Sequence, residues 1–223
     1  RIGAHRFEKS PKEADAFWLG SYLAVGTGIE IYDHGMTTPP EYIPAAGASG
    51  VDLSDLDRNG TLEMVITGDF GVATVWRTPG GWVRRLVSQT IFHDMEIGDI
   101  TGDGRPDLVG HDWDAVRVHA QQPNGRFAAV QRYIPSAGCF GCIEDIEVAD
   151  VTGDGRADAI AVTPWESQVY VLPQTAAGSL GAAQGYFSGR LPDGVKAVDM
   201  DGDGRRDVVM ITEFEITIMR QLA

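Results

Sequence analysis

Four copies of a short acidic loop recur along the chain and constrain its fold more than any other feature. The loops begin at Asp55, Asp99, Asp150 and Asp199, and each has oxygen-bearing side chains at loop positions 1, 3, 5 and 9 with glycine at position 6. A β-type run follows each loop, as in residues 208–211. Oxygens at alternate positions around a glycine-permitted tight turn can converge on one hard cation, and Ca²⁺ takes six to eight oxygen ligands. The spacing therefore predicts calcium-binding turns between strands.

The predicted ligands are the oxygen-bearing residues of each loop. In the first two loops they are Asp55, Asp57, Asn59 and Glu63 with the backbone carbonyl of Thr61, and then Asp99, Thr101, Asp103 and Asp107. In the last two they are Asp150, Thr152, Asp154 and Asp158, and then Asp199, Asp201, Asp203 and Asp207. The alternative is a set of acidic glycine turns without metal. Four loops in register favour up to four calcium ions, because clustered carboxylates without a cation repel one another.

The loops also set the period of the chain. Their first residues fall at 55, 99, 150 and 199, so the units repeat after 44, 51 and 49 residues, which is typical of a propeller, solenoid or array. Each unit predicts four strands, for example 95–99, 108–110, 115–120 and 126–133, followed by 146–150, 159–163, 168–172 and 185–189. Four short strands per unit at this spacing indicate an all-β fold, a β-propeller of four-stranded blades.

The two ends of the chain suggest how the ring closes. The last unit predicts only three strands (195–199, 207–211 and 215–220), whereas residues 5–9 form a lone strand that could complete it. A unit without a metal loop (15–19, 22–25, 30–32 and 41–44) follows that strand. We therefore expect a single β-propeller domain of five blades, at about 13–46, 51–90, 95–134, 145–190 and 195–223 plus 5–9. The alternatives are a fragment of a larger ring and half of a ring built by a dimer.

The segment 98–109 and its counterparts at 149–160 and 198–209 resemble the FG-GAP repeat family, also called VCBS repeats. The resemblance covers about residues 51–223, although the first loop has Asn59-Gly60 where the others have Asp-Gly. It implies a calcium-binding β-propeller like those of integrin α-subunits, bacterial secreted proteins and some fungal lectins. The family includes adhesion proteins, lectins and domains appended to lyases, so the resemblance specifies fold and calcium rather than activity.

Composition excludes several classes of partner. The net charge of −14 and the pI near 4.6 argue against binding to nucleic acid or to an anionic membrane, which both need basic patches. No apolar run approaches the roughly 20 residues that span a bilayer, so membrane insertion is not expected. The chain begins with Arg1 rather than methionine, which suggests processing or truncation. Loops of this kind stay filled where calcium is millimolar, so we expect a secreted or extracellular protein.

The two cysteines lie close together, as Cys139 and Cys142. A zinc site would need a second pair of ligands, and haem attachment would need histidine after Cys142. A small disulfide that pins a connection between blades is the first interpretation, and a redox-active pair is the alternative.

Aromatic residues recur at the turns between the second and third strands, at the end of each unit opposite the metal loops. They are Phe70, Trp113, Trp165 and Phe214. Phe70 and Phe214 are expected to pack between blades. Trp113 and Trp165 have charged neighbours, namely Asp112, Asp114 and Glu166, and His93 lies on a connection at the same end. Aromatic faces beside carboxylates suit sugar rings, which stack on the ring and hydrogen-bond through their hydroxyls.

These features lead to three hypotheses of function. The first is a lectin-like module, not an enzyme, that captures carbohydrate or a cell-surface glycan at several weak sites. The second is a polysaccharide lyase or hydrolase that uses His93 and acids facing a central channel, although no motif assigns catalytic residues. The third is a structural or cell-adhesion module with a protein partner, in which calcium only rigidifies the blades.

Overall fold

The computed structural model describes residues 15–18, 28–32, 41–138, 142–213 and 215–222. Within these ranges the regular elements are β-strands and one short 3₁₀ helix, η1 (Pro164–Glu166), so the all-β class is confirmed. The described part of the chain holds no helix that is long and apolar enough to cross a membrane. The predicted strands 5–9 and 22–25 lie outside the described residues.

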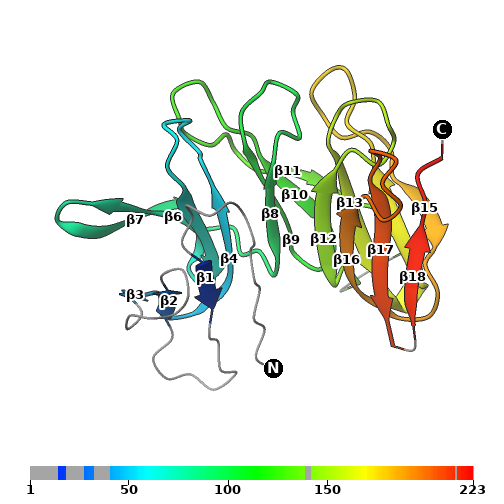
Figure 1. The fold of residues 1–223 in the computed structure, drawn as a ribbon, viewed down its shortest axis with the longest axis horizontal. Coiled ribbons are helices and arrows are strands. Elements are labelled where there is room, and N and C mark those ends of the chain that lie inside the picture. Colours follow the sequence, from blue (N-terminus) through cyan, green and yellow to red (C-terminus); the bar gives the residue numbers. More distant parts are fainter. Residues whose placement is uncertain (1–14, 19–27, 33–40, 139–141, 214, 223) are drawn as a thin grey trace. The chain divides into compact units, whose positions relative to one another are not determined.

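The chain divides into two compact units. The first consists of Arg1–Val51 and Glu63–Ile91, and the second consists of Asp52–Leu62 and Phe92–Ala223. Each unit is built from antiparallel sheets in which consecutive strands pair (Figure 1). This is the strand order that short turns between neighbouring strands produce.

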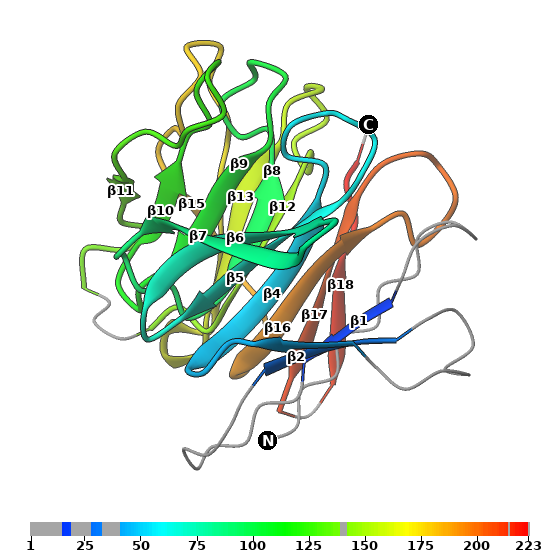
Figure 2. The ribbon, with the colours of Figure 1, turned by 90° about the vertical axis from the view of Figure 1, so that its left-hand side faces the viewer.

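The first unit contains a three-stranded and a four-stranded sheet. The smaller sheet consists of β1 (Asp15–Trp18), β2 (Gly28–Tyr32) and β3 (Glu41–Pro44). The larger sheet consists of β4 (Ala48–Ser54), β5 (Glu63–Gly68), β6 (Gly71–Thr78) and β7 (Gly81–Ser88). Figure 2 shows β6 and β7 as a long antiparallel pair, and the outer strand β7 is the more exposed of the two.

The second unit contains three sheets, and in each of them an acidic loop joins the first strand to the second. The first two are β8 (Met95–Gly98), β9 (Asp107–His111), β10 (Val116–His119) and β11 (Gln131–Tyr133), and then β12 (Asp145–Ala149), β13 (Asp158–Thr163), β14 (Gln168–Leu172) and β15 (Gln184–Phe187). The third is β16 (Pro192–Val198), β17 (Asp207–Thr212) and β18 (Ile216–Met219). The predicted strands of these units are therefore confirmed, with ends that differ by a few residues.

Burial follows the order of strands within each sheet. The second strands β9 and β13 are buried along their whole length, whereas the outer strand β15 is exposed along its length. Ile146, Ala159 and Ala161 pack with Val109 and Val116 of the preceding sheet in one core cluster. Val162 and Val169 pack with Val195 and Met210 of the following sheet in another. Both faces of the middle sheet are therefore covered, which explains the continuous apolar run in β13.

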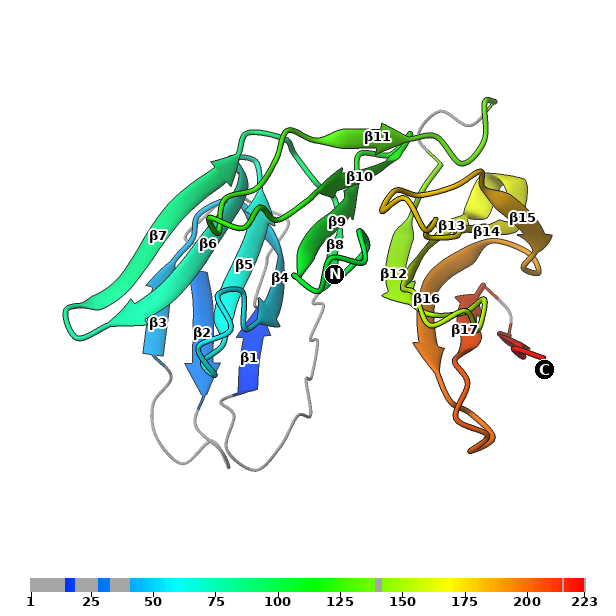
Figure 3. The same cartoon turned by 90° about the horizontal axis from the view of Figure 1, so that it is seen from above.

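The first strands of the three sheets follow one another in space. Strand β12 packs beside both β8 and β16, as the view in Figure 3 shows. Four-stranded antiparallel sheets arranged with their first strands together are consistent with propeller blades. The number of blades and the closure of the ring by residues 5–9 stay predictions.

Candidate functional sites

The acidic loops share one backbone conformation. In all four, the backbone N–H of the position-6 glycine donates to Oδ2 of the first aspartate, over 2.8 Å for Gly60, 2.6 Å for Gly104, 2.8 Å for Gly155 and 2.9 Å for Gly204. These glycines have φ between 79° and 87°, a region that costs other L-residues about 1–2 kcal/mol. The glycine is therefore required by the turn that folds each loop around its first carboxylate.

The fourth loop brings three carboxylates together. One oxygen each from Asp199, Asp201 and Asp203 lie within 4.8 Å of one another, as a single cation would require. The backbone N–H of Gly204 lowers the pKa of Asp199, which keeps that carboxylate ionised. Arg205 Nη1 lies 2.8 Å from Asp203 Oδ2, so an arginine partly balances the charge.

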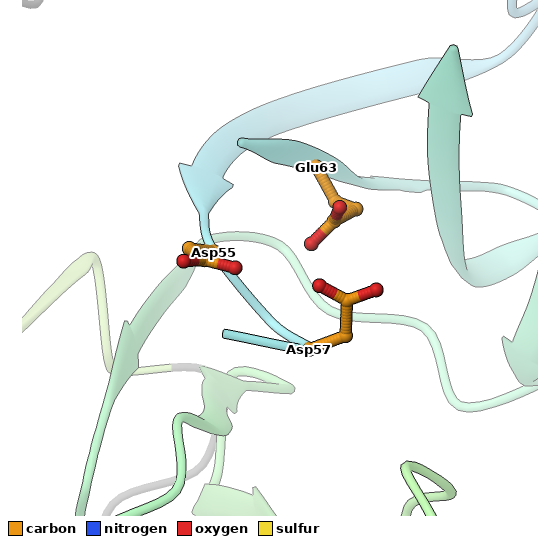
Figure 4. A group of neighbouring side chains, drawn as sticks. All are labelled: Asp55, Asp57 and Glu63. Atoms are coloured by element: carbon orange, nitrogen blue, oxygen red, sulfur yellow. The ribbon is translucent and has the colours of Figure 1, made fainter. Parts of the chain in front are cut away.

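The first loop also brings three carboxylates together. Carboxylate oxygens of Asp55, Asp57 and Glu63 lie within 4.8 Å of one another, and Figure 4 shows the three groups turned toward a common point. Asn59 Oδ1 accepts the backbone N–H of Thr61 over 2.8 Å at the same turn. The position-9 glutamate thus points inward in this loop.

The position-9 aspartates of the other loops serve a different purpose. Asp107 and Asp158 are fully buried, and each accepts backbone N–H groups on both oxygens. Burial raises the pKa of both carboxyls, and the N–H donors oppose that rise. These aspartates tie the loop to the end of the third strand of their own sheet. Their predicted role as direct metal ligands stays a prediction.

The position-5 aspartates of the second and third loops are paired with arginine. Arg105 pairs with Asp103, and Arg156 pairs with Asp154. Thr101 Oγ1 donates to Asp107 Oδ2 over 2.9 Å, and the backbone N–H of Thr152 donates to Asp158 Oδ2 over 3.0 Å. A cation in either loop would therefore have to share the position-5 carboxylate with arginine or displace it, and the same holds in the fourth loop, where Arg205 pairs with Asp203 and Arg220 with Asp201.

The donor set fits a hard divalent cation in the first and fourth loops. Three carboxylates converge in each of these loops, and they are oxygen ligands of the type that Ca²⁺ binds. Two acidic clusters of this chain could thus hold metal ions. A bound cation would neutralise the clustered charge and hold each loop in one conformation.

In the sheet β8–β11, at the end opposite the acidic loop, the β9–β10 turn presents an exposed tryptophan. Trp113 is 43% exposed, has φ of 75°, and packs against His93 in a tilted arrangement with 3.9 Å between the ring centroids. Its backbone carbonyl accepts the N–H groups of Cys142 and Ile143 over 3.0 and 2.9 Å. A positive φ on a bulky residue is a strained conformation that surrounding contacts must hold, and such strain clusters at functional sites.

Acidic groups flank this tryptophan, as predicted from the sequence. Asp112 Oδ2 pairs with Arg117, and Asp112 Oδ1 accepts the N–H of Ala115 over 3.0 Å. Asp114 is half-buried on the same turn. Burial lowers the pKa of His93 and lowers that of the neighbouring His111 to about 3, so both imidazoles are neutral at pH 7.

The β13–β14 turn repeats this arrangement, but here the positive φ falls on Ser167, at 54°, and not on the tryptophan. Trp165 is 80% exposed on η1, and the adjacent Glu166 accepts hydrogen bonds from Ser136 Oγ at 2.8 Å and Tyr170 Oη at 2.9 Å. The carboxylate is thus oriented beside an open aromatic face. In the first unit, Arg84 lies 3.7 Å over the ring of Phe70 and covers it. Phe214 lies outside the described residues.

The first strands carry a group of charges that sequence reasoning missed. Asp52, Glu96, Glu147 and Lys196 each stand three residues before the first aspartate of a loop. Lys196 Nζ lies 2.6 Å from Glu96 Oε1 and 2.9 Å from Glu147 Oε2. Burial raises the pKa of Asp52 to about 6 and, with repulsion from Glu147, that of Glu96 to about 7. Comparison of equivalent positions across the repeats could have identified this group.

Two further acids, Asp94 and Asp145, stand two residues before Glu96 and Glu147 and contact each other. The carboxyl groups of Asp94 and Asp145 are hydrogen-bonded to each other, and burial together with this contact raises the pKa of Asp145 to about 7. Asp145 Oδ2 also accepts the N–H of Val195 over 2.8 Å, so this side chain connects β12 to β16. One carboxyl of the pair can therefore donate its proton to the other.

Cys142 is buried at the connection that leads into β12. Cys139 lies outside the described residues, so the disulfide stays a prediction.

The repeated antiparallel sheets of this chain, four of which have an acidic glycine loop between their first two strands, are those of an all-β repeat protein. Residues 99–161 and 150–210 match a family model described as FG-GAP-like repeat. The two matches together span half of the chain, so the protein belongs to the FG-GAP-like repeat family. This confirms the resemblance that the loop motifs suggested. No curated protein sequence matches the chain.

Among solved structures, the fold is similar to that of a lectin from Agrocybe aegerita, described for its specific recognition of non-reducing terminal N-acetylglucosamine. The TM-score is 0.62 at 20% identity, over 87% of this chain and 57% of the lectin, so the chain spans little more than half of that protein. At this identity the likeness shows the fold alone. A Photorhabdus luminescens Tc holotoxin pore aligns at a TM-score of 0.46 and 20% identity, over 93% of this chain and 11% of that one.

Proposed function

We propose that the protein is a secreted carbohydrate-binding module that calcium stabilises and that belongs to a β-propeller. The observation that carries the proposal is the strained, half-exposed Trp113, held against His93 on a turn whose carboxylates are oriented by hydrogen bonds. An aromatic face beside fixed polar groups is the arrangement that binds a sugar ring. The fold likeness to an N-acetylglucosamine-recognising lectin supports this ligand class.

Two such turns on one rigid array support capture of a glycan with several terminal sugars. Trp165 with Glu166 repeats the aromatic–carboxylate pair of Trp113 with Asp112 in the next sheet. Two weak sites that are held at a fixed spacing gain avidity for a multivalent ligand. Calcium in the second and third loops, which join the first two strands of the sheets that carry these turns, would rigidify those sheets.

The direct test is binding to immobilised glycans that end in N-acetylglucosamine, with calcium present. Trp113→Ala and Trp165→Ala should each weaken binding at least tenfold to a multivalent surface, while thermal unfolding stays cooperative. The matched control is Phe187→Ala, which removes an aromatic that is 67% exposed on β15 and lies on neither turn. Equal binding by all three variants and the wild type would refute the assignment of these turns.

One observation favours a second candidate function, an enzyme that acts on polysaccharide. Asp94, next in sequence to His93, is hydrogen-bonded to Asp145, and both carboxyls have the raised pKa that a general acid requires. Release of reducing ends or unsaturated sugars from a polysaccharide, lost in Asp145→Asn, would support this function. Wild-type protein without such activity on substrates that it binds would favour the lectin.

A further inference from the structure

Three glutamines lie at equivalent places, just beyond the third strands β10, β14 and β18. The backbone N–H of each donates to Oδ1 of the position-9 aspartate in its own sheet. The three pairs and their distances are Gln121 with Asp107 at 2.7 Å, Gln174 with Asp158 at 3.0 Å, and Gln221 with Asp207 at 3.0 Å. Each glutamine is thus attached through its backbone to the acidic loop of its own sheet.

The side chains of the same glutamines reach in the other direction, to the preceding loop. Gln121 Nε2 donates to the carbonyl of Leu56 in the first loop over 2.9 Å, and Gln174 Nε2 donates to the carbonyl of Asp99 in the second loop over 3.0 Å. The two glutamines are 5% and 2% exposed. Water therefore does not compete for these hydrogen bonds, and loss of either would leave a buried carbonyl without its donor.

The fit between glutamine and loop is close enough to restrict the loop sequence. A Cβ at Gly102 would lie 3.1 Å from Gln174 Oε1, and a Cβ at Gly153 would lie 3.0 Å from Gln221 Nε2. At Gly202 of the fourth loop, a Cβ would meet nothing within 4 Å among the described residues. The second and third loops are therefore packed directly against a glutamine of the following sheet.

Arginine completes the link between the carboxylates and the glutamines. Arg105 Nε donates to the backbone carbonyl of Gln121 over 2.9 Å while its Nη2 pairs with Asp103. Arg156 Nε donates to the carbonyl of Gln174 over 3.0 Å while its Nη2 pairs with Asp154. The arginine side chain thus contacts both the position-5 carboxylate and the glutamine, so a cation that displaces it from the carboxylate also affects its hydrogen bond to the glutamine.

We propose that the acidic loops bind cations cooperatively, because Gln121 couples the first loop to the second and Gln174 couples the second to the third. Gln221 continues the series, since it is attached to the fourth loop and its buried Nε2, without a partner among the described residues, lies against the third. The inference rests on the cation binding in the proposed function, and it adds a dependence between sites.

The coupling is expected to be positive, because a bound cation orders its loop and this ordering extends to the next loop. A cation fixes the backbone of its loop and hence the carbonyl to which the next glutamine donates. That glutamine is bonded to the position-9 aspartate of the following loop, so the following loop loses less conformational entropy when it binds its own cation. Linkage makes the effect reciprocal, and each loop raises the affinity of its neighbour by the same factor.

The test is a calcium titration of the full chain by calorimetry, for the wild type and for Gln174→Met. Methionine keeps the length of the side chain and removes its hydrogen bonds. The wild type should bind with a Hill coefficient above one. Gln174→Met should lower that coefficient toward one and weaken at least one ion roughly three- to tenfold, the range that one hydrogen bond supplies. The control is Gln122→Met, which changes an exposed neighbour of Gln121.

The outcomes separate the two proposals. A wild type that binds no calcium overturns both the calcium part of the proposed function and the coupling. A wild type that binds several ions independently, with an isotherm that Gln174→Met leaves unchanged, overturns the coupling alone. If Gln174→Met does not fold, hydrogen exchange of the wild type decides. The amides of Thr101 and Thr152 should gain protection at the same calcium concentration, and protection at separate concentrations overturns the coupling.

Discussion

Lys196 Nζ lies 2.6 Å from Glu96 Oε1, and the two residues stand at equivalent positions on the first strands of two different sheets. A lysine therefore occupies the place that an acid occupies in the three preceding repeats. Burial alone would lower the pKa of Lys196, but the carboxylates of Glu96 and Glu147 outweigh it and raise the pKa above its ordinary value. The ammonium acts as a fixed cation that holds β8, β12 and β16 together.

Lys196→Met should destabilise the protein more at pH 8 than at pH 6. At pH 8 the loss leaves an ionised Glu96 beside Glu147 without its ammonium partner, whereas at pH 6 Glu96, with a pKa of about 7, is protonated and is repelled less. We expect a loss of about 1–2 kcal/mol in the free energy of unfolding at pH 8, a modest figure because Lys196 is more than half exposed. Urea unfolding at both pH values measures it. Lys196→Arg is the control, and equal losses at the two pH values would contradict the prediction.

Without metal, the protein should become less stable as the pH rises from 6 to 8. The folded pKa of Asp145 is about 7, well above the value of about 4 for an aspartate in an unfolded chain. The folded state thus holds a proton that the unfolded state lacks between these values, and this contribution to stability disappears as the pH rises through 7. Glu96 and Asp52, with pKa values of about 7 and 6, act in the same direction.

Asp145→Asn isolates the contribution of that residue. An amide imitates the protonated carboxyl at every pH, so the variant should lose part of the pH dependence while it keeps its stability at pH 6. Melting curves in excess chelator, from pH 5.5 to 8.5, provide the measurement. The chelator is essential, because cation binding strengthens as carboxylates ionise and would oppose the trend. A variant with the full wild-type slope would show that the Asp94–Asp145 pair is not its source.

The loops and strands could be predicted from the sequence because both depend on local patterns. The position-6 glycine and the alternating oxygens of 199–207 form a turn through contacts within nine residues. The apolar runs beside the loops became β9, β13 and β17 for the same reason. The exposed Trp113 and Trp165 were also recognisable, because charged neighbours on a turn distinguish them from core aromatics.

The contacts between repeats could not be predicted in this way. Gln174 and Asp99 are 75 residues apart, and no local pattern marks a glutamine after a third strand as a donor to the previous loop. The position-9 aspartates look like metal ligands by spacing, but burial of Asp158 against two sets of N–H groups emerges only when the strands pack. The meeting of Lys196 with Glu96 likewise depends on the adjacency of sheets.

Asp203→Ala should lower the melting temperature when calcium is present and change it little in excess chelator. The substitution removes one of three converging carboxylates in the fourth loop, so the ion contributes less stability by mass action. Each kcal/mol lost corresponds to about 2–4 °C for a chain of this size. The matched control, Glu213→Ala, removes an exposed acid from the β17–β18 turn, outside any loop. Equal losses with calcium and with chelator would remove the metal assignment for this loop.

Trp113→Gly should be more stable than Trp113→Ala, against the usual order of these residues. Both changes remove the packing against His93, but the φ of 75° at this position costs alanine about 1 kcal/mol or more and costs glycine little. At Trp165, on the 3₁₀ helix, the order should be normal, with alanine about 0.5–1 kcal/mol better than glycine. Urea unfolding of the four variants in saturating calcium measures both differences.

If alanine were the better residue at both positions, the backbone at Trp113 would relax once the indole is removed, and the strain would come from the side chain. If glycine is better at 113 alone, the backbone of the turn imposes the strain, and the tryptophan is kept there at the expense of stability, as a binding site would require.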